Sequence, residues 1–483
     1  MPRVAAVAAG NADTARAAAT VLRAGGNAVD AVVAAGFAAS VAEPGLSSLG
    51  GGGFLLWAPA GGPERLLDFF TDAPGRGRPP GFRAPPLPIT VRFSGVDQVF
   101  HAGWGSVAVP GCLDGYVHAV RAHGRLPLAQ VVAPAVDLAR TGSVLDATQA
   151  GFLVLLEDIL TLTAEGRAVF APHGRLLGAG ERLRNPDLAD LLDDVGRGVV
   201  SGVADLAGAL HAAAEAGGGR LSADDLHAYS VHERQPLRAS YRGAELVTNP
   251  PPSFGGSLVL TALGELEAHP SLNGKTHATR HLAAALVRMS ERHVAGPTAV
   301  RGTTHVSAVD ADGGLAALTM SNGSCAGVFA PGTGIQLNNV MGEADLHPHG
   351  LEATAPGVRI GSMMAPTVVR TPDGTRTALG SGGSERIRSA LLCTLVGLVD
   401  RGESLVDAVA APRLHWDRSV LQVEPGLPAD VVAVLRAART VSEWSARDLY
   451  FGGVHAVAHR PDGSVDAVGD ARRSGATELV RLG

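Results

Sequence analysis

Aromatic side chains and long apolar runs are both scarce in this sequence. Phe, Trp and Tyr make up 4% of the residues, so a core has to be built mainly from Ala, Val and Leu. The longest mainly apolar stretch, residues 31–42, is too short to cross a bilayer. The apolar run at residues 4–9 is shorter than the core of a secretion signal. We therefore expect a soluble, cytoplasmic protein that does not bind a membrane.

Cysteine is scarce too, and neither sign of charge dominates. Three cysteines are present, and they are too widely spaced for a zinc site and too few for a disulfide framework: Cys112, Cys325 and Cys393. A formal net charge of −6 and a pI near 6.3 give no electrostatic signature of a nucleic-acid-binding protein. With 46% hydrophobic and 18% charged residues, the chain is expected to be globular.

Signals for helices and for strands are both present, but they do not alternate strictly. Residues 11–42 predict two helices separated by the turn Gly25-Gly26-Asn27. Further helices are expected at residues 115–122, 128–140, 188–195, 257–267, 277–294, 384–401 and 429–438. Short strands are expected at residues 54–57, 246–252, 305–309, 315–320, 334–337, 366–370 and 454–459. This order argues against a doubly wound parallel sheet, and no linker divides the chain into independent domains.

The segment from Gly302 to His305 opens one of the expected strands and is the most informative part of the sequence. A Thr hydroxyl is a poor nucleophile unless a nearby group accepts its proton. If the Gly302–Thr303 bond breaks, the freed α-amine of Thr303, with an unperturbed pKa of about 7.7–8.0, can act as that base. Gly302 tolerates the strained backbone that attack on its carbonyl requires. On local pattern alone, Thr303 and Thr304 are better explained as β-branched residues that begin a strand.

Two other segments place small or polar residues where strands are expected to end. Gly382 and Gly383 lie at a strand-to-helix turn, whose free N–H groups suit an oxyanion or a phosphate, although such turns are also common without a function. Ser321 and Asn322 could line a pocket with residues 331–345, or simply satisfy turns. The run Gly50–Gly53 lacks a nucleotide-binding signature, so close backbone packing is the simpler interpretation.

Taken together and in order, these segments resemble the γ-glutamyltranspeptidase family of N-terminal-nucleophile hydrolases. The resemblance covers nearly the whole chain. Its motifs are AGGNAVDA (24–31), LGGGGF (49–54), PPPSFGG (250–256), TTHVSAVD (303–310), PGTGIQLNN (331–339), SMMAP (362–366), GSGGS (380–384) and FGGV (451–454). Each motif alone is weak evidence, whereas all of them in this order are specific.

The resemblance implies an α+β fold with four αββα layers. It implies one intertwined domain that cleaves itself into residues 1–302 and 303–483, which then stay together. It further implies a small-molecule substrate and neither a metal nor an organic cofactor. A homo-oligomer is left open.

The resemblance also implies roles for individual residues. Thr303 would be the nucleophile and, through its α-amine, the base, and Gly302 would precede the cleaved bond. The backbone N–H groups of Gly382 and Gly383 would hold the oxyanion, and Ser321 would orient the nucleophile. The candidate substrate-binding residues are Asn322, Glu343, Ser362, Phe70 and Val340.

Several positions depart from the family's pattern around the substrate. Phe70 stands where the family's motif places an arginine that binds the substrate α-carboxylate, and Arg76 and Arg78 follow out of register. Val340 stands where a polar residue is expected, and Met363 where many members have a second serine. The pattern therefore predicts retained catalytic groups and an altered substrate site.

Gly323 also departs from the family, because an asparagine is expected there, although Asn322 is adjacent and Glu343 retains the expected carboxylate. Three hypotheses follow. The first is a hydrolase repurposed in secondary metabolism to cleave a carbon–carbon bond or a non-glutamyl amide. The second is a γ-glutamyl hydrolase or transferase that acts on glutathione-like amides. The third is an inactive scaffold that never matures, against which the retained Gly302-Thr303-Thr304 argues.

Overall fold

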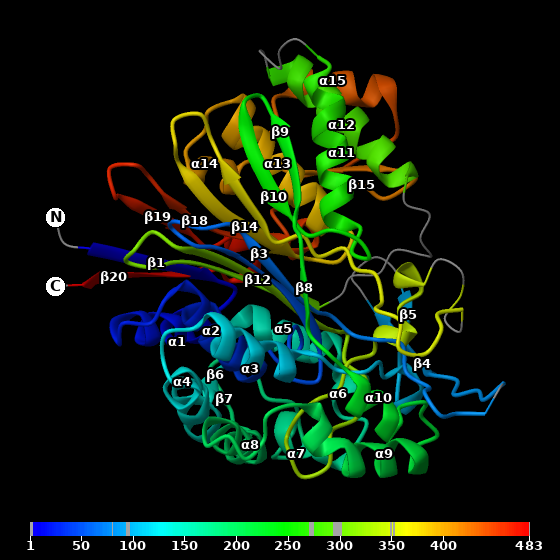
Figure 1. Ribbon diagram of the computed structural model, residues 1–483. Helices are drawn as coiled ribbons and strands as arrows, with labels where there is room; N and C mark the ends of the chain where they lie inside the picture. Colours follow the sequence, from blue (N-terminus) through cyan, green and yellow to red (C-terminus); the bar gives the residue numbers. More distant parts are fainter. Residues whose placement is uncertain are drawn as a thin grey trace.

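Two β-sheets are stacked face to face at the centre of the molecule, and a layer of helices covers the outer face of each (Figure 1). The computed structural model describes residues 3–79, 81–92, 97–269, 275–292, 302–347, 350 and 353–482. Mixed helices and strands in this layer order confirm the predicted α+β, four-layer αββα fold.

The first sheet has seven strands, and every neighbouring pair is antiparallel. In sheet order, they are β20 (Ala476–Leu482), β1 (Arg3–Ala9), β11 (Gly302–Val309), β12 (Leu315–Gly323), β2 (Gly52–Ala58), β3 (Arg65–Phe69) and β8 (His232–Arg234). The first and last strands of the chain pair with each other, so the two ends of the described chain lie side by side at the left of Figure 1.

The second sheet has six strands, which are also antiparallel. Their order is β19 (Val465–Val468), β18 (Gly453–His459), β14 (Arg376–Gly382), β13 (Thr367–Arg370), β10 (Ala244–Thr248) and β9 (Leu237–Tyr241). Each of the two large sheets therefore contains strands from both sides of the Gly302–Thr303 bond. Three small sheets lie outside these layers: β15 (Leu414–Trp416) with β16 (Leu421–Val423) and β17 (Val441–Glu443), β4 (Leu87–Arg92) with β5 (Asp97–Ala102), and β6 (Ser143–Val144) with β7 (Arg182–Leu183).

The helices form two groups. Below the first sheet in Figure 1 lie α1 (Ala12–Arg23), α2 (Ala28–Ala42), α3 (Cys112–His123), α4 (Leu128–Thr141), α5 (Ala147–Leu155), α6 (Glu157–Leu160), α7 (Ala164–Phe170), α8 (Pro186–Gly196), α9 (Ala207–Ala216) and α10 (Ala223–Ala228). Above the second sheet lie α11 (Gly255–Glu267), α12 (Lys275–Glu291), α13 (Arg386–Asp400), α14 (Leu405–Ala410) and α15 (Ala429–Ala438). Short 3₁₀ helices span Trp104–Ser106, Val203–Leu206, Val340–Gly342, Ala344–Leu346, Leu449–Phe451 and Ala471–Arg473.

Helix α2 shows why so few aromatic residues suffice. All of its residues are buried, and an Asn27–Asp30 capping box starts it directly after the predicted turn. A helix that is apolar on every side can be enclosed by the first sheet and neighbouring helices, and small Ala and Val side chains let these elements approach closely. The predicted helix pair at residues 11–42 is thus confirmed.

One strand was not foreseen from the sequence, and one expected strand is absent. Residues 4–9 lie in β1, between β11 and β20, where the apolar run becomes part of the core. Residues 334–337 do not form a strand, because their backbone pairs only through two isolated bridges, from Gln336 to Phe329 and from Leu337 to Gly50. The end of the predicted helix at residues 277–294 lies outside the described residues.

The described residues include no helix long and apolar enough to cross a membrane. Within the same part of the chain, no group of three or more His, Cys, Asp and Glu side chains is placed to hold a metal ion. All three cysteines are buried and free, as their spacing predicts.

A buried network of charges lies beneath the last strands. Asp470 accepts hydrogen bonds from Arg413 at 2.5 Å and from the Val454 backbone at 3.0 Å. Arg472 also contacts Asp470, and it pairs with Glu424 at 2.6 Å. Burial opposes ionisation of Asp470, but the two arginines outweigh it and lower the pKa of Asp470 to about 2.

We predict that Asp470→Asn lowers the free energy of unfolding by about 3–5 kcal/mol, because it leaves the buried Arg413 without its carboxylate partner and Arg472 with Glu424 alone. Urea unfolding of the uncleaved Thr303→Ala chain would measure this. Since the folded-state pKa lies below the unfolded value, this contribution is complete above about pH 4 and is lost as the pH falls towards 2. Asp466→Asn is the matched control, because its pair with Arg460 is exposed. Equal losses in both variants would contradict the prediction.

Candidate active site

Thr303 is the second residue of β11, and its side chain points between the two sheets. Alternation along the strand directs Thr304, Val306 and Ala308 towards the helices, while Thr303 faces the second sheet. The β11–β12 register shifts between Gly302 and Thr304, which marks a local irregularity at Thr303. Thr303 Oγ1 lies 2.8 Å from the carbonyl oxygen of Gly302, the residue before the expected cleavage.

Ser321, near the end of β12, contacts both the Gly302 carbonyl oxygen and the Thr303 hydroxyl. Its hydroxyl donates to the Gly302 carbonyl oxygen at 2.5 Å, and its oxygen lies 3.3 Å from Thr303 Oγ1. The Gly323 backbone N–H donates to Ser321 Oγ at 2.9 Å, which leaves the hydroxyl hydrogen directed at Gly302. A hydrogen bond of this kind polarises a carbonyl and stabilises negative charge on its oxygen.

A small pocket opens at Thr303, and most of the predicted substrate-binding residues line it. Its lining residues are Phe70, Thr303, Ser321, Val340, Glu343, Asp345, Leu346, Ser362, Met363, Met364, Ser384 and Ile387. The structure therefore brings together residues from six separate segments of the sequence. None of the described residues that line this pocket is Lys or Arg.

Phe70 forms a rigid apolar part of the wall. Its ring stacks on Phe54 with centroids 5.7 Å apart, and the residue is 1% exposed. Its backbone carbonyl accepts hydrogen bonds from Tyr229 at 2.8 Å and from Arg359 at 2.6 Å. Arg359 is paired with Asp68, so it stabilises the backbone at Phe70 and does not line the pocket.

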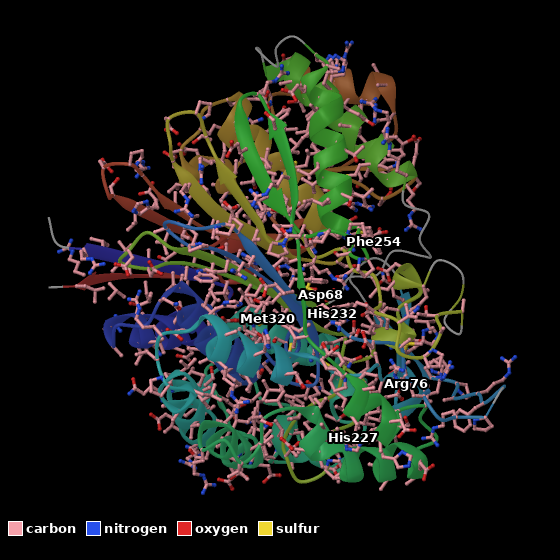
Figure 2. All side chains as sticks on the ribbon, in the orientation of Figure 1. Asp68, Arg76, His227, His232, Phe254 and Met320 are labelled. Carbon is pink, nitrogen blue, oxygen red and sulfur yellow. The ribbon has the colours of Figure 1, made fainter. Side chains whose placement is uncertain are left out.

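Arg76 and Arg78, the arginines that follow Phe70, lie outside this pocket. Arg78 pairs with Glu215 at 2.8 Å and donates to the Leu221 carbonyl at 3.1 Å. The side chain of Arg76 covers Gly357. Figure 2 shows Arg76 well below Asp68, beside α10. Neither arginine replaces the one that Phe70 displaces.

The proline-serine-glycine motif supports another wall of the pocket. Ser253 Oγ donates to the carbonyls of Ser362 at 2.8 Å and Met364 at 3.0 Å. Gly255 lies directly against this segment, because a Cβ there would come within 2.1 Å of the Met363 carbonyl. The motif at residues 250–256 thus holds the Ser362–Met364 segment in place.

Glu343 lines the pocket beside Gly323, which has a φ of +68°. A Cβ at position 323 would lie 2.2 Å from Asn339 Oδ1 and 2.5 Å from Glu343 Oε1. The asparagine that the family places here therefore could not fit without movement of both neighbours. Glycine lets the backbone turn while Glu343 approaches it closely.

The structure places Asn322 away from the pocket. Strand alternation turns its side chain to the opposite face from Ser321, where its amide nitrogen lies 3.4 Å from the Pro44 carbonyl and 3.3 Å from Cys325 Sγ. Of the five predicted substrate-binding residues, Asn322 is thus the one that the pocket does not include.

The predicted glycine turn closes the other side of Thr303. A Cβ at Gly382 would lie 2.1 Å from the Thr303 carbonyl oxygen, so only glycine fits there. Gly383 has a φ of +121°, which an L side chain rarely adopts. The Gly50–Gly53 run shows similar close packing, since a Cβ at Gly51 would lie 2.2 Å from the Ser321 carbonyl oxygen. The interpretation of this run as a backbone packing element is confirmed.

His305 lies two residues after Thr303, but it is enclosed. Its ring nitrogens contact Thr319 Oγ1 and Ser307 Oγ, each at 2.8 Å, and it is 0% exposed. Burial, with a smaller effect from His455, holds the pKa of His305 well below its usual range. A neutral, fully hydrogen-bonded imidazole on this strand braces the sheet and leaves the role of base to another group.

Sequence reasoning did not single out four other lining residues, Leu346, Met364, Ser384 and Ile387, and it included Asp345 only as the end of the segment 331–345. Met364 and Ser384 lie inside motifs that were recognised, so closer reading of those motifs could have found them. Asp345 and Leu346 are in the short 3₁₀ helix Ala344–Leu346, whose position relative to Thr303 depends on tertiary packing.

Comparison with known proteins agrees with this geometry. The model of the Gamma-glutamyltranspeptidase family matches residues 14–295 and 283–480. An acylase ACY 1 proenzyme of Pseudomonas sp. (strain SE83) is 32% identical, with 96% of this chain and 91% of that protein covered. A glutathione hydrolase proenzyme of Escherichia coli (strain K12) is 28% identical, with 94% and 87% covered.

The same fold is found in the crystal structure of cephalosporin acylase from Bacillus halodurans. The TM-score is 0.82 at 24% identity, and 99% of this chain and 96% of that chain are covered. Fold, motif order and whole-chain sequence similarity all agree, and the chain belongs to the γ-glutamyltranspeptidase family of self-processing N-terminal-nucleophile hydrolases.

Proposed function

We propose that this protein is an acylase that hydrolyses an amide whose acyl group lacks the charged γ-glutamyl head group, with Thr303 as its nucleophile. The observation that carries the proposal is that Phe70 lines the Thr303 pocket at the position where the family motif places an arginine. Its ring is held there by stacking on Phe54. The name of the 32% identical acylase supports the same class of reaction.

Self-cleavage comes first in this proposal. Thr303 Oγ1 attacks the Gly302 carbonyl carbon while Ser321 hydrogen-bonds to the carbonyl oxygen on which negative charge develops. The bond between Gly302 and the Thr303 nitrogen breaks, which gives an ester at Oγ1 and a free α-amine. Water then hydrolyses the ester. Residues 1–302 and 303–483 stay together, because both sheets contain strands of both fragments.

The mature site then runs the same chemistry on substrate. The α-amine of Thr303 takes the hydroxyl proton as Oγ1 attacks the acyl carbonyl, and the proton passes to the leaving amine. The backbone N–H groups of Gly382 and Gly383 hold the oxyanion. Water completes the reaction by releasing the acid from Thr303.

The pocket favours an acyl group with less charge than γ-glutamyl. A glutamyl α-carboxylate would face Phe70, Val340 and Met363, and the carboxylates of Glu343 and Asp345 line the same pocket. Hydrogen bonds to a charged group contribute about 1.5–3 kcal/mol each, so the loss of one costs roughly ten- to a hundredfold at ~1.4 kcal/mol per decade. The carbon–carbon bond hydrolysis suggested by the resemblance, a role in secondary metabolism, a cytoplasmic location and a homo-oligomer stay predictions.

We predict that the purified protein separates on a denaturing gel into fragments 1–302 and 303–483, and that the smaller one begins Thr-Thr-His. Thr303→Ala should give one uncleaved band and no hydrolysis, because both reactions use the same hydroxyl. Intact mass and N-terminal sequencing provide the measurement. Normal cleavage of Thr303→Ala would remove Thr303 from the mechanism.

Gly382→Ala should also block maturation and activity, by at least a hundredfold. Its new methyl group would lie 2.1 Å from the Thr303 carbonyl oxygen, so either the strand carrying the nucleophile or the oxyanion turn has to move. Gly264→Ala is the matched control, because a Cβ there meets nothing within 4 Å and alanine favours the helix. If both variants mature at the wild-type rate, this part of the proposal is wrong.

For the substrate, we expect kcat/KM for pentanoyl 4-nitroanilide to exceed that for γ-glutamyl 4-nitroanilide by at least tenfold. The two acyl chains have the same length and differ in the amine and carboxylate. Phe70→Arg should shift this ratio towards the γ-glutamyl compound by restoring a guanidinium at the pocket wall. A wild-type preference for the γ-glutamyl compound would instead support the alternative γ-glutamyl hydrolase or transferase.

A further inference from the structure

A buried carboxylate contacts the residue that follows Thr303. Thr304 Oγ1 donates to Glu43 Oε2 at 2.6 Å, and Thr14 Oγ1 donates to Glu43 Oε1 at 2.7 Å. Glu43 is 0% exposed. Thr14 and Glu43 belong to residues 1–302, whereas Thr304 belongs to residues 303–483, so this hydrogen bond crosses the boundary between the expected fragments.

The position of Glu43 disfavours a negative charge and therefore lowers the stability of the folded protein. It is the C-cap of α2, where the helix dipole disfavours negative charge. No ion pair with Glu43 occurs among the described residues, and burying an unpaired carboxylate is costly. A buried, unpaired carboxylate that contacts the neighbour of the proposed nucleophile is a candidate for a functional role.

The backbone closes tightly around this contact. A Cβ at Gly10 would lie 2.6 Å from Glu43 Oε2 and 2.7 Å from Thr304 Oγ1. A Cβ at Gly302 would lie 2.3 Å from the Gly45 carbonyl oxygen, two residues after Glu43. The segment that carries Glu43 thus packs against residues on both sides of Thr303.

We propose that Glu43 is a positioning residue: it anchors Thr304 and thereby holds Thr303 in register after the Gly302–Thr303 bond has broken. Cleavage turns Thr303 into a free chain end, and chain ends fray unless they are tied down. The hydrogen bond from Thr304 to Glu43 supplies a tie from the other fragment. The Arg473 guanidinium also donates a hydrogen bond to the Thr303 carbonyl oxygen, at 3.5 Å. This inference rests on the proposed role of Thr303.

The charge on Glu43 changes near neutral pH. Burial raises its pKa to about 7, against the hydrogen bonds from Thr304 and Thr14. The other groups that affect it are Asp146, which raises the pKa, Arg473, which lowers it, and Tyr116, which lies near it. Ionised Glu43 accepts hydrogen bonds from both threonines. Protonation places a hydrogen on one of the two carboxyl oxygens, which then accepts a hydrogen bond less well. The anchor is therefore strongest above about pH 7.

The first test compares Thr304→Val with Thr14→Val. Both variants keep the side-chain shape and remove one hydroxyl from the same carboxylate, but only Thr304 is on the strand that carries Thr303. We expect Thr304→Val to slow self-cleavage and to lower kcat on pentanoyl 4-nitroanilide at least tenfold, with KM within twofold of wild type. Thr14→Val should lower the melting temperature similarly and retain kcat within threefold. Equal kcat values in the two variants would overturn the inference.

The second test needs no threonine variant and uses the pH profile of Glu43→Gln. If Glu43 and the α-amine of Thr303 must both lose a proton, log kcat on the acid side approaches a slope of 2 in wild type. Glutamine does not titrate and still accepts one hydrogen bond, so the slope should fall to 1. An unchanged profile would contradict the inference, since a purely structural Glu43 alters the amount of folded enzyme and not this slope.

The two proposals fail in different ways. Cleavage of Thr303→Ala would overturn the assignment of the nucleophile and, with it, this inference. An uncleaved Thr303→Ala together with unaltered kcat in Thr304→Val and an unaltered slope in Glu43→Gln would overturn the role of Glu43 alone.

Discussion

The pairing of β11 with β12 is the constraint on which the rest of the site depends. It brings Ser321 to within 2.5 Å of the Gly302 carbonyl oxygen, and the irregular register at this point leaves Thr303 free to face the second sheet. Both strands are completely buried, so a slip by one residue would turn polar groups into the core. The geometry for self-cleavage is therefore as firmly determined as the core itself.

Glycines account for much of the remaining geometry at the reacting atoms. Gly382, Gly51 and Gly302 each lie where a Cβ would overlap a backbone carbonyl. Gly382 consequently packs against Thr303, Gly51 against Ser321 and Gly302 against Gly45 more closely than any side chain would permit. The same close approach explains how a pocket this small can bring together residues from six segments.

The wall of the Thr303 pocket differs in character from the proposed catalytic groups. The pocket has apolar walls formed by Phe70, Val340, Met363 and Ile387. Its acidic lining residues are Glu343 and Asp345, and none of the described lining residues is Lys or Arg. Because Thr303 and the Gly382-Gly383 turn, the proposed nucleophile and oxyanion site, are held by backbone packing, side chains of the wall can change without disturbing them. This separation is consistent with a family that includes both an acylase and glutathione hydrolases.

By itself, the sequence determined the family, the α+β layers, the helix pair at residues 11–42 and Thr303 as the candidate nucleophile, because ordered motifs and local periodicity carry that information. It also predicted five of the pocket residues correctly as neighbours of Thr303: Phe70, Val340, Glu343, Ser362 and Ser321. Only the tertiary structure decided that Asn322 faces away, that residues 334–337 form no strand and that residues 4–9 lie inside a sheet. The contact of Glu43 with Thr304 spans 261 positions in the sequence. Strand register and long-range packing set such contacts, and no local pattern encodes them.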